Sequence, residues 1–274
     1  VLVKREEQQF EVATFRREVR EDELSDDPLA PPVGDNVFVT LEVDARRRDF
    51  TINGLFYDPI GDRLIDYAEG LPDLEKRVVR MIGDPSKRLL EDPIRILRAL
   101  RLKHMIGFTL DPDLREAMQV HATCLEKAVL PRKREEILKW LRLPDPSAPF
   151  LESYDLGILR SISPTMVHTM ENSNGVTDFF ELLRRTHDAG LDKSNPLELF
   201  GSLVHAFVRT FLVPDPLASL KTKDLMDHPV LVPWMRDELG MFKFEQALVV
   251  KALHMQPLLA RRKEFQKRGE RRQF

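Results

Sequence analysis

The sequence contains a single cysteine, Cys124, which excludes an intrachain disulfide and a cysteine-based metal cluster. A lone cysteine agrees with a reducing compartment. No apolar run reaches the roughly 18 residues that a membrane span requires, and the first residues lack the apolar stretch of a signal peptide. These absences predict a cytoplasmic protein with no membrane partner.

Neither sign of charge dominates, because the formal net charge is -3 over 274 residues. The charges are nevertheless unevenly distributed: acidic residues gather at 18–27, and basic residues gather near the end of the chain. This basic tail includes Arg261, Arg262, Lys267, Arg268, Arg271 and Arg272. With Phe265 among its cations and Phe274 after them, the tail fits either a solvated helix surface or contact with an RNA backbone.

The order of patterns predicts an α+β protein that is mainly helical. Alternation over residues 8–16 is typical of a half-buried strand, and Asp49 is suited to cap a short helix over residues 50–57. Strands are expected at 63–67 and 78–82. We therefore expect a small, truncated α/β head over residues 1–84.

The remainder of the chain is predicted to be helical throughout. Asp92 is suited to the N-cap of the first long helix, with Pro93 at its first position. Further helices are expected at 111–126, 132–142, 176–189, 195–212 and 242–268. We divide this part into a helical neck, residues 85–145, and a helical body, residues 146–274, which carries the basic tail.

Two arginine-rich segments are the strongest candidates for a functional site. The first contains Arg47, Arg48 and Asp49, followed by Asn53; the second contains Asp92, Arg95, Arg98 and Arg101. A guanidinium group offers several donors in fixed geometry, which suits phosphate. Two interpretations remain open: a pocket wall that holds the sugar and phosphates of a nucleotide, or solvated helix surfaces with a cap and local ion pairs.

A series of motifs in one order resembles the class II nucleotidyltransferases, which include the bacterial poly(A) polymerases and the tRNA CCA-adding enzymes. The poly(A) polymerase branch is the more similar. The motifs are Glu11–Arg16, Asp35–Phe38, Arg47–Asn53, Asp66–Leu74, Glu91–Arg101 and the neck segment Pro131–Lys139. Gly54 and the run Leu102–His104 depart from the family pattern, which has Ala or Ser at the first and an aromatic residue followed by small ones at the second.

The resemblance implies ATP held between head and neck, with the Arg-Arg-Asp segment on its sugar and phosphates. It also implies two Mg²⁺ ions on an Asp-x-Asp pair and a third acid, which Glu11 matches. The one Asp-x-Asp in the sequence, Asp111–Asp113, is interpreted as a helix cap. Because one carboxylate cannot hold two Mg²⁺ ions, no metal site is predicted, and ATP and Mg²⁺ are expected only if an upstream segment supplies the pair.

The sequence thus predicts an RNA-binding protein that resembles poly(A) polymerase and cannot itself add nucleotides. Two alternatives remain: a fragment of an active enzyme that adds AMP from ATP to RNA 3′ ends, or a protein-interaction scaffold. The expected partner is RNA with a single-stranded 3′ end or a tRNA-like shape, bound by Arg132, Lys133 and the basic tail. Missing neighbouring strands would leave the head with an exposed edge through which the chain could self-associate.

Overall fold

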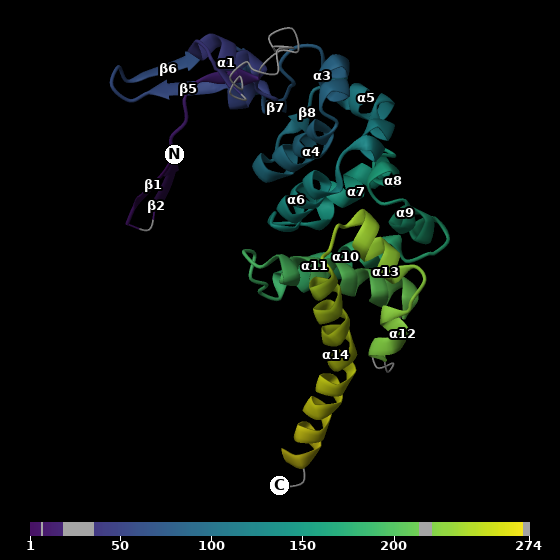
Figure 1. Cartoon of the computed structure of the whole chain (residues 1–274). Coiled ribbons are helices and arrows are strands. Elements are labelled where there is room, and N and C mark those ends of the chain that lie inside the picture. Colours follow the sequence, from purple (N-terminus) through teal and green to yellow (C-terminus); the bar gives the residue numbers. More distant parts are fainter. Residues whose placement is uncertain (7, 19–35, 214–220, 271–274) are drawn as a thin grey trace, which may run out of the picture. The chain divides into compact units, whose positions relative to one another are not determined.

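The computed structural model describes residues 1–6, 8–18, 36–213 and 221–270, which form two compact units (Figure 1). Unit 1 comprises Val1–Arg88 and Thr109–Leu114, and unit 2 comprises Leu89–Phe108 and Arg115–Phe274. Arg271 and Arg272 of the predicted basic tail lie outside the described residues. The expected class, α+β and mainly α, is confirmed.

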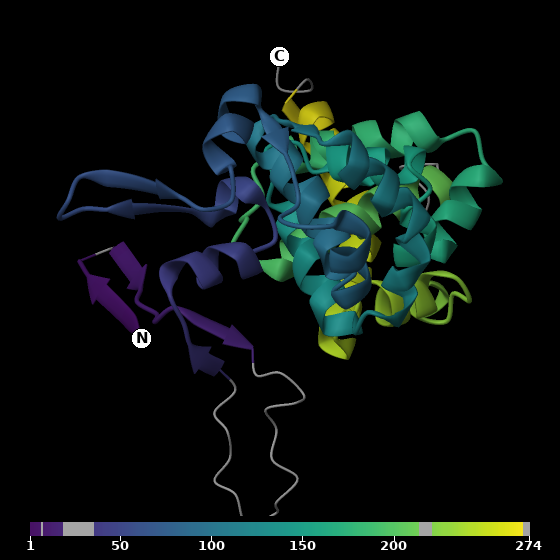
Figure 2. The ribbon, with the colours of Figure 1, turned by 90° about the horizontal axis from the view of Figure 1, so that it is seen from above.

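The strands of unit 1 that the structure describes form two-stranded sheets. Three of these pairs are antiparallel: β1 (Leu2–Arg5) with β2 (Gln8–Glu11), β3 (Arg16–Glu18) with β4 (Asn36–Phe38), and β5 (Leu55–Asp58) with β6 (Arg63–Asp66). The β5–β6 pair is an extended ribbon (Figure 2). A parallel pair joins β7 (Val78–Val79) to β8 (Thr109–Leu110), which brings residues far apart in sequence together.

The strand predicted over residues 8–16 is shorter than expected and is not half-buried. Within this range Gln8–Glu11 forms β2, every residue of which is exposed, and Arg16 begins the separate strand β3. Alternation in sequence makes two faces, but burial needs a second layer against one of them. Phe10 of β2 is therefore 49% exposed, and Val12, one residue beyond the strand, is 55% exposed.

The helix predicted over residues 50–57 is wrong. Helix α1 (Leu41–Arg47) lies before it, a 3₁₀ turn η2 (Thr51–Gly54) replaces it, and the chain then enters β5. Phe50 forms a β-bridge with Met81, and the amide of Ile82 donates to the carbonyl of Asp49 at 3.0 Å. Because these residues pair with residues 80–82, their backbone is extended and Asp49 does not cap a helix.

Three helices follow α1 in the sequence: α2 (Gly70–Lys76), α3 (Pro85–Glu91) and α4 (Ile94–Ile106). Unit 2 begins within α3, at Leu89. Helix α2 lies between β6 and β7 in the sequence. Helix α4 begins one residue later than predicted, with Pro93 at the N-cap position. Asp92 still acts at this end, because its Oδ1 accepts from the amide of Ile94 at 3.2 Å.

The helices of unit 2 follow the predicted positions for the long segments. The expected helix at 111–126 is divided into α5 (Pro112–Val120) and the 3₁₀ segment η3 (Ala122–Lys127). The next helices are α6 (Leu130–Leu141), α7 (Ser147–Asp155), α8 (Leu159–Ile162), α9 (Pro164–Glu171) and α10 (Val176–Asp188). Then come α11 (Pro196–Phe207), the π-helix η4 (Val208–Leu212), α12 (Thr222–Met226), α13 (Leu231–Pro233), the π-helix η5 (Trp234–Glu238) and α14 (Lys243–Glu270).

The core of unit 2 contains two tryptophans, Trp140 and Trp234. Both are fully buried. The indole of Trp140 on α6 donates to the carbonyl of Leu97 on α4 at 2.9 Å, and Trp234 stacks on Phe207 at 4.2 Å between ring centroids. Cys124, in contrast, is partly exposed. Within the described ranges, the structure contains no helix long and apolar enough to cross a membrane.

Candidate functional site

A buried carboxylate, Asp44 of α1, holds two of the predicted arginines of unit 1. Arg47 donates to Oδ1 of Asp44 through Nε at 2.9 Å and Nη2 at 2.7 Å. Arg48 donates to Oδ2 through Nε at 3.2 Å and Nη2 at 3.1 Å. The Asp44 side chain is 3% exposed, whereas those of Arg47 and Arg48 are 42% and 39% exposed. The buried carboxylate of Asp44 thus orients both guanidinium groups, and both remain accessible to solvent.

Arg48 has two further fixed contacts. Its Nη1 donates to the carbonyl of Asn53 at 2.9 Å, and its Cζ lies 4.6 Å from the centroid of the Phe56 ring. The backbone of the Arg47–Arg48 pair is itself held, because Nη2 of Arg88 donates to the carbonyls of both residues at 2.7 Å and 3.0 Å. Arg47, Arg48, Asp49 and Asn53 therefore lie in one locally rigid segment of unit 1.

A second polar network supports this segment from the other side of η2. Thr51 donates to the carboxylate of Asp73 at 2.7 Å. Arg80 donates to Asp73 through Nε and to Asp111 through Nη1 at 2.6 Å. Burial opposes the charge of Arg80, but the hydrogen bond that Arg80 donates to Asp73 and the negative charge of Asp111 outweigh burial and raise the pKa of Arg80. Asp111, predicted to be a helix cap, is a buried partner of this arginine.

Two glycines permit the close packing around η2. A Cβ at Gly70 would lie 2.4 Å from the carbonyl oxygen of Thr51, so glycine is required there. A Cβ at Gly54 would lie 3.0 Å from the side chain of Ala68. The departure from the family pattern at Gly54 therefore coincides with tight packing against Ala68.

In unit 2, one buried carboxylate again organises the predicted cations. Glu136 of α6 is 3% exposed and faces three positive groups. Its Oε2 accepts from Nε of Arg101 at 3.0 Å, and its Oε1 lies 2.8 Å from Nζ of Lys139 and 3.6 Å from Nε of Arg98. Arg98 and Arg101 of α4 thus pair with a carboxylate of α6.

Asp92 and Arg95 differ from the other members of their motif. Arg95 is only 12% exposed and pairs with Glu91 one turn earlier, so the arginines do not form a continuous ridge. Asp92 accepts from Nη2 of Arg132 at 2.6 Å, which links the start of α4 to α6. Lys133 lines a separate cavity of about 410 Å³ with Glu126 and Glu238.

The run at Leu102–His104, which departs from the family pattern, has a structural role in unit 2. Leu102 is buried, and the next two side chains converge on Glu152 of α7. Oε1 of Glu152 lies 2.5 Å from Nζ of Lys103, and Oε2 lies 2.7 Å from Nε2 of His104. Burial opposes ionisation, but these hydrogen bonds outweigh it and lower the pKa of Glu152.

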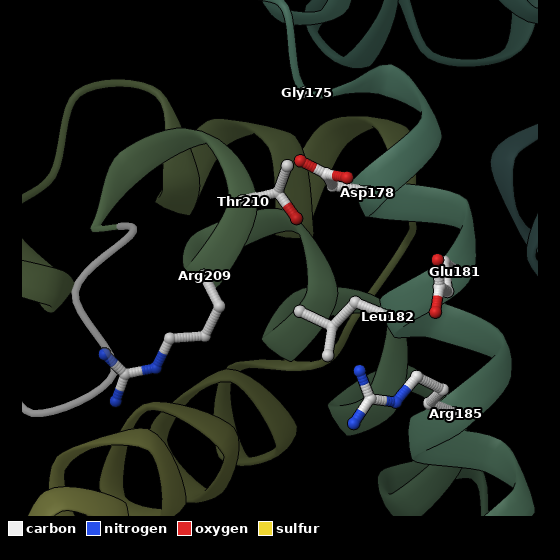
Figure 3. A pocket seen from close by; sticks show the side chains of 7 residues that line it. All are labelled: Gly175, Asp178, Glu181, Leu182, Arg185, Arg209 and Thr210. Atoms are coloured by element: carbon white, nitrogen blue, oxygen red, sulfur yellow. The ribbon is translucent and has the colours of Figure 1, made fainter.

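A polar cavity of about 370 Å³ lies between α10 and η4 (Figure 3). Arg185 and Arg209 line it, together with Asp178 and Glu181. Two cations and two carboxylates leave no surplus charge for an anion. This cavity is therefore a weaker candidate for phosphate than the Asp44 and Glu136 clusters.

Sequence reasoning missed Asp44 and Glu136, the two carboxylates that orient the arginines. Asp44 had a readable signal, because it lies three and four residues before Arg47 and Arg48 on one helix. Glu136 lies 35 residues beyond Arg101, so only the packing of α4 against α6 identifies it. Four basic tail residues, Arg261, Arg262, Lys267 and Arg268, lie in α14, and their side chains are among those not described.

Two segments of the chain match known protein families. Residues 1–80 match the family described as "Poly A polymerase head domain", and residues 107–169 match "Probable RNA and SrmB- binding site of polymerase A". Over 139 residues the chain is 40% identical to poly(A) polymerase I of Escherichia coli O6:H1. The chain belongs to the poly(A) polymerase and CCA-adding nucleotidyltransferase family.

The matches within the nucleotidyltransferase family are partial. The Escherichia coli match covers 48% of this chain and 30% of the relative. A CCA-adding enzyme of Bacillus licheniformis is 37% identical over 142 residues, which is 52% of this chain and 34% of the relative. The chain therefore spans about a third of the length of these relatives.

Solved structures support the same fold. An apo CCA-adding enzyme aligns with a TM-score of 0.54 and 22% identity, over 81% of this chain and 49% of its own. The structure titled "Structure of tRNA-processing enzyme with CTP" aligns with a TM-score of 0.52 and 25% identity, over 81% of this chain and 64% of its own.

The family resemblance implies metal ions, which would need a cluster of oxygen ligands. No group of three His, Cys, Asp or Glu side chains within residues 1–6, 8–18, 36–213 and 221–270 is placed to hold one. Glu11, the proposed third acid, is exposed on β2. Because Mg²⁺ requires several oxygen ligands in octahedral geometry, the described residues do not fit the ion.

Proposed function

We propose that this chain forms the nucleotide-holding and RNA-holding part of an RNA nucleotidyltransferase. The observation that carries the proposal is a surplus of oriented positive charge. Arg47 and Arg48 share one carboxylate, Asp44, and three cations share Glu136. Guanidinium groups held on a buried acid keep donors that can bind phosphate without first being ordered.

In this proposal the unit 1 segment contacts the sugar and phosphates of ATP. Arg47 and Arg48 supply the charge, and Asp49 and Asn53 supply hydrogen-bonding groups for ribose hydroxyls. In unit 2, Arg98, Arg101, Arg132 and Lys133 bind RNA phosphates, joined by the basic residues of α14. The family match over residues 107–169 supports RNA as the partner.

We further propose that the 274 residues alone bind RNA without extending it. Transfer of a nucleotidyl group needs metal ions to neutralise the phosphates and activate the attacking hydroxyl. The described carboxylates offer no such cluster. A cytoplasmic location, and self-association through the exposed β1–β2 pair, also remain predictions.

The alternative is that the chain is part of an enzyme that adds AMP to RNA 3′ ends with ATP and Mg²⁺. Its support is the naming of the relatives, of which the chain spans about a third. In that case residues outside the described ranges would supply the metal ligands. Incubating the 274-residue protein with a labelled RNA, ATP and Mg²⁺ decides between the two, because any 3′ extension contradicts the proposal that it cannot transfer nucleotides.

RNA binding distinguishes the proposed function and the active-enzyme alternative from a protein-interaction scaffold. The RNA affinity of the 274-residue protein should fall steeply between about 50 and 200 mM salt, because bound phosphates release counterions. Replacing Arg261 and Arg262 by Gln should reduce that salt dependence. A protein with no measurable RNA affinity at low salt would support the scaffold.

A further inference from the structure

Three aromatic rings and one guanidinium group form a stack between the core of unit 2 and its surface. Its members, in order, are Phe200, Arg134, Phe242 and Phe244. The buried Phe200 of α11 lies at one end, with Cζ of Arg134 at 4.9 Å from its ring centroid. The same Cζ lies 4.7 Å from the centroid of Phe242. Arg134 therefore contacts one aromatic ring in the core and a second that is 57% exposed.

The guanidinium group in this stack is rigidly held. Its Nη2 donates to Oε1 of Glu245 at 2.8 Å, and its Nη1 donates to Oε2 at 3.2 Å. Oε2 of Glu245 also accepts from the amide of Phe242 at 2.7 Å, which fixes the backbone before α14. Gly240 has a positive φ of 65°, and a Cβ there would lie 3.3 Å from Cβ of Arg134. The turn is therefore built for this close approach.

Phe244 is the outermost ring of the stack. Its centroid lies 6.0 Å from that of Phe242, the planes differ by 10°, and the side chain is 62% exposed. Side chains of α14 are described as far as Pro257, and over residues 243–257 the lysines Lys243 and Lys251 are exposed. The one acid of this stretch, Glu245, is buried against Arg134.

We propose that Phe244 is a stacking platform for an unpaired base of bound RNA. This inference rests on the proposed RNA-binding function and adds a specific contact to it. An ordered aromatic ring with an exposed face accepts any base, because every base presents a π-face. The two exposed lysines suit the phosphates beside such a base, whereas they suit a purely apolar partner poorly. The platform thus favours single-stranded over duplex RNA.

The first test compares four variants with the wild-type protein for binding to a single-stranded oligoadenylate at fixed salt. Phe244→Ala and Phe244→Leu should each weaken binding by about tenfold or more, and Phe244→Tyr should retain it. Leu248→Ala, which removes an exposed apolar side chain one turn later, is the matched control and should bind like the wild type. The dependence of affinity on salt should be the same for Phe244→Ala and wild type, since stacking releases no counterions.

A second test reports the contact directly. Trp140 and Trp234 are fully buried, so Phe244→Trp adds an exposed indole that RNA can reach. The oligoadenylate should quench its fluorescence, and inorganic polyphosphate, which has no bases, should not. Equal affinity of the Phe244→Leu and wild-type proteins overturns the stacking platform.

A third outcome identifies a different occupant. If sedimentation shows a dimer that Phe244→Ala and Leu248→Ala both dissociate, the surface joins two copies of the chain and the proposal is wrong. Failure of the wild-type protein to bind any RNA would instead refute the proposed function, so the two failures are distinguishable. Circular dichroism checks that each variant is folded, as expected for a substitution at an exposed side chain.

Discussion

Asp44 offers the sharpest test of the site in unit 1, because one buried carboxylate orients two exposed guanidinium groups. The change is Asp44→Asn, which keeps the shape of the side chain and removes its charge. One oxygen remains to accept a hydrogen bond, and the other is replaced by an amide that repels the arginine it faces. We expect the Arg47–Arg48 pair to lose its fixed orientation while α1 remains folded.

The magnitude follows from burial and exposure. A hydrogen bond to a charged group contributes about 1.5–3 kcal/mol when it is buried. The guanidinium groups of Arg47 and Arg48 are about 40% exposed, so water compensates part of each loss. With one acceptor retained, we expect Asp44→Asn to lower the stability of unit 1 by about 2 kcal/mol. ATP affinity should fall by about tenfold, because the phosphates then meet disordered cations.

The assay must report on unit 1 by itself. Both tryptophans lie in unit 2, so tryptophan fluorescence would not detect the change. Hydrogen exchange followed by mass spectrometry detects the change at the amides of Thr51 and Ile82, which donate to the carbonyls of Arg80 and Asp49. A loss of 2 kcal/mol corresponds to roughly 30-fold faster exchange.

The same helix provides the control. Glu42→Gln removes a carboxylate that pairs with Arg46 at the surface, where both side chains are at least half exposed. It should change stability by less than about 0.5 kcal/mol and leave ATP affinity unaltered. If Asp44→Asn and Glu42→Gln behave alike, burial of the carboxylate is not what orients the arginines, and the reasoning is refuted.

Three further predictions concern packing and charge. Gly70→Ala should destabilise unit 1 by about 1–3 kcal/mol, measured by hydrogen exchange, because the new Cβ would lie 2.4 Å from a backbone carbonyl oxygen. Gly201→Ala is the control: the nearest atom to its new Cβ is 3.9 Å away, so the variant should unfold in urea like the wild type or be more stable. Glu136→Gln should lower the stability of unit 2 by about 2 kcal/mol, measured by tryptophan fluorescence in urea, and its exposed neighbour Glu135→Gln should change it little. Because the pKa of Glu152 is lowered, its ion pairs contribute stability that is fully present above pH 4.5 and is lost as the pH falls through the lowered pKa. Glu152→Gln should therefore remove this acid-induced loss of stability. If the variant and the wild type lose stability equally as the pH falls, the ion pair is contradicted.

The sequence by itself determined the family and the main helices. The order of the motifs identified the family, because residue types at fixed spacing can be recognised without coordinates. Helices such as α6, α10 and α11 were readable because their apolar periodicity and their start signals are local. The two arginine-rich segments were also found in this way, since a run of arginines beside an acid is a local pattern.

The tertiary structure decided what those residues contact. The segment after Asp49 is an extended chain and a 3₁₀ turn because it pairs with residues 80–82, which no helical cap signal could reveal. Glu136 orients Arg98 and Arg101 only because α4 packs on α6. Likewise, the stack that ends at Phe244 begins on a different helix. Each of these depends on contacts between residues distant in sequence, which local patterns do not encode.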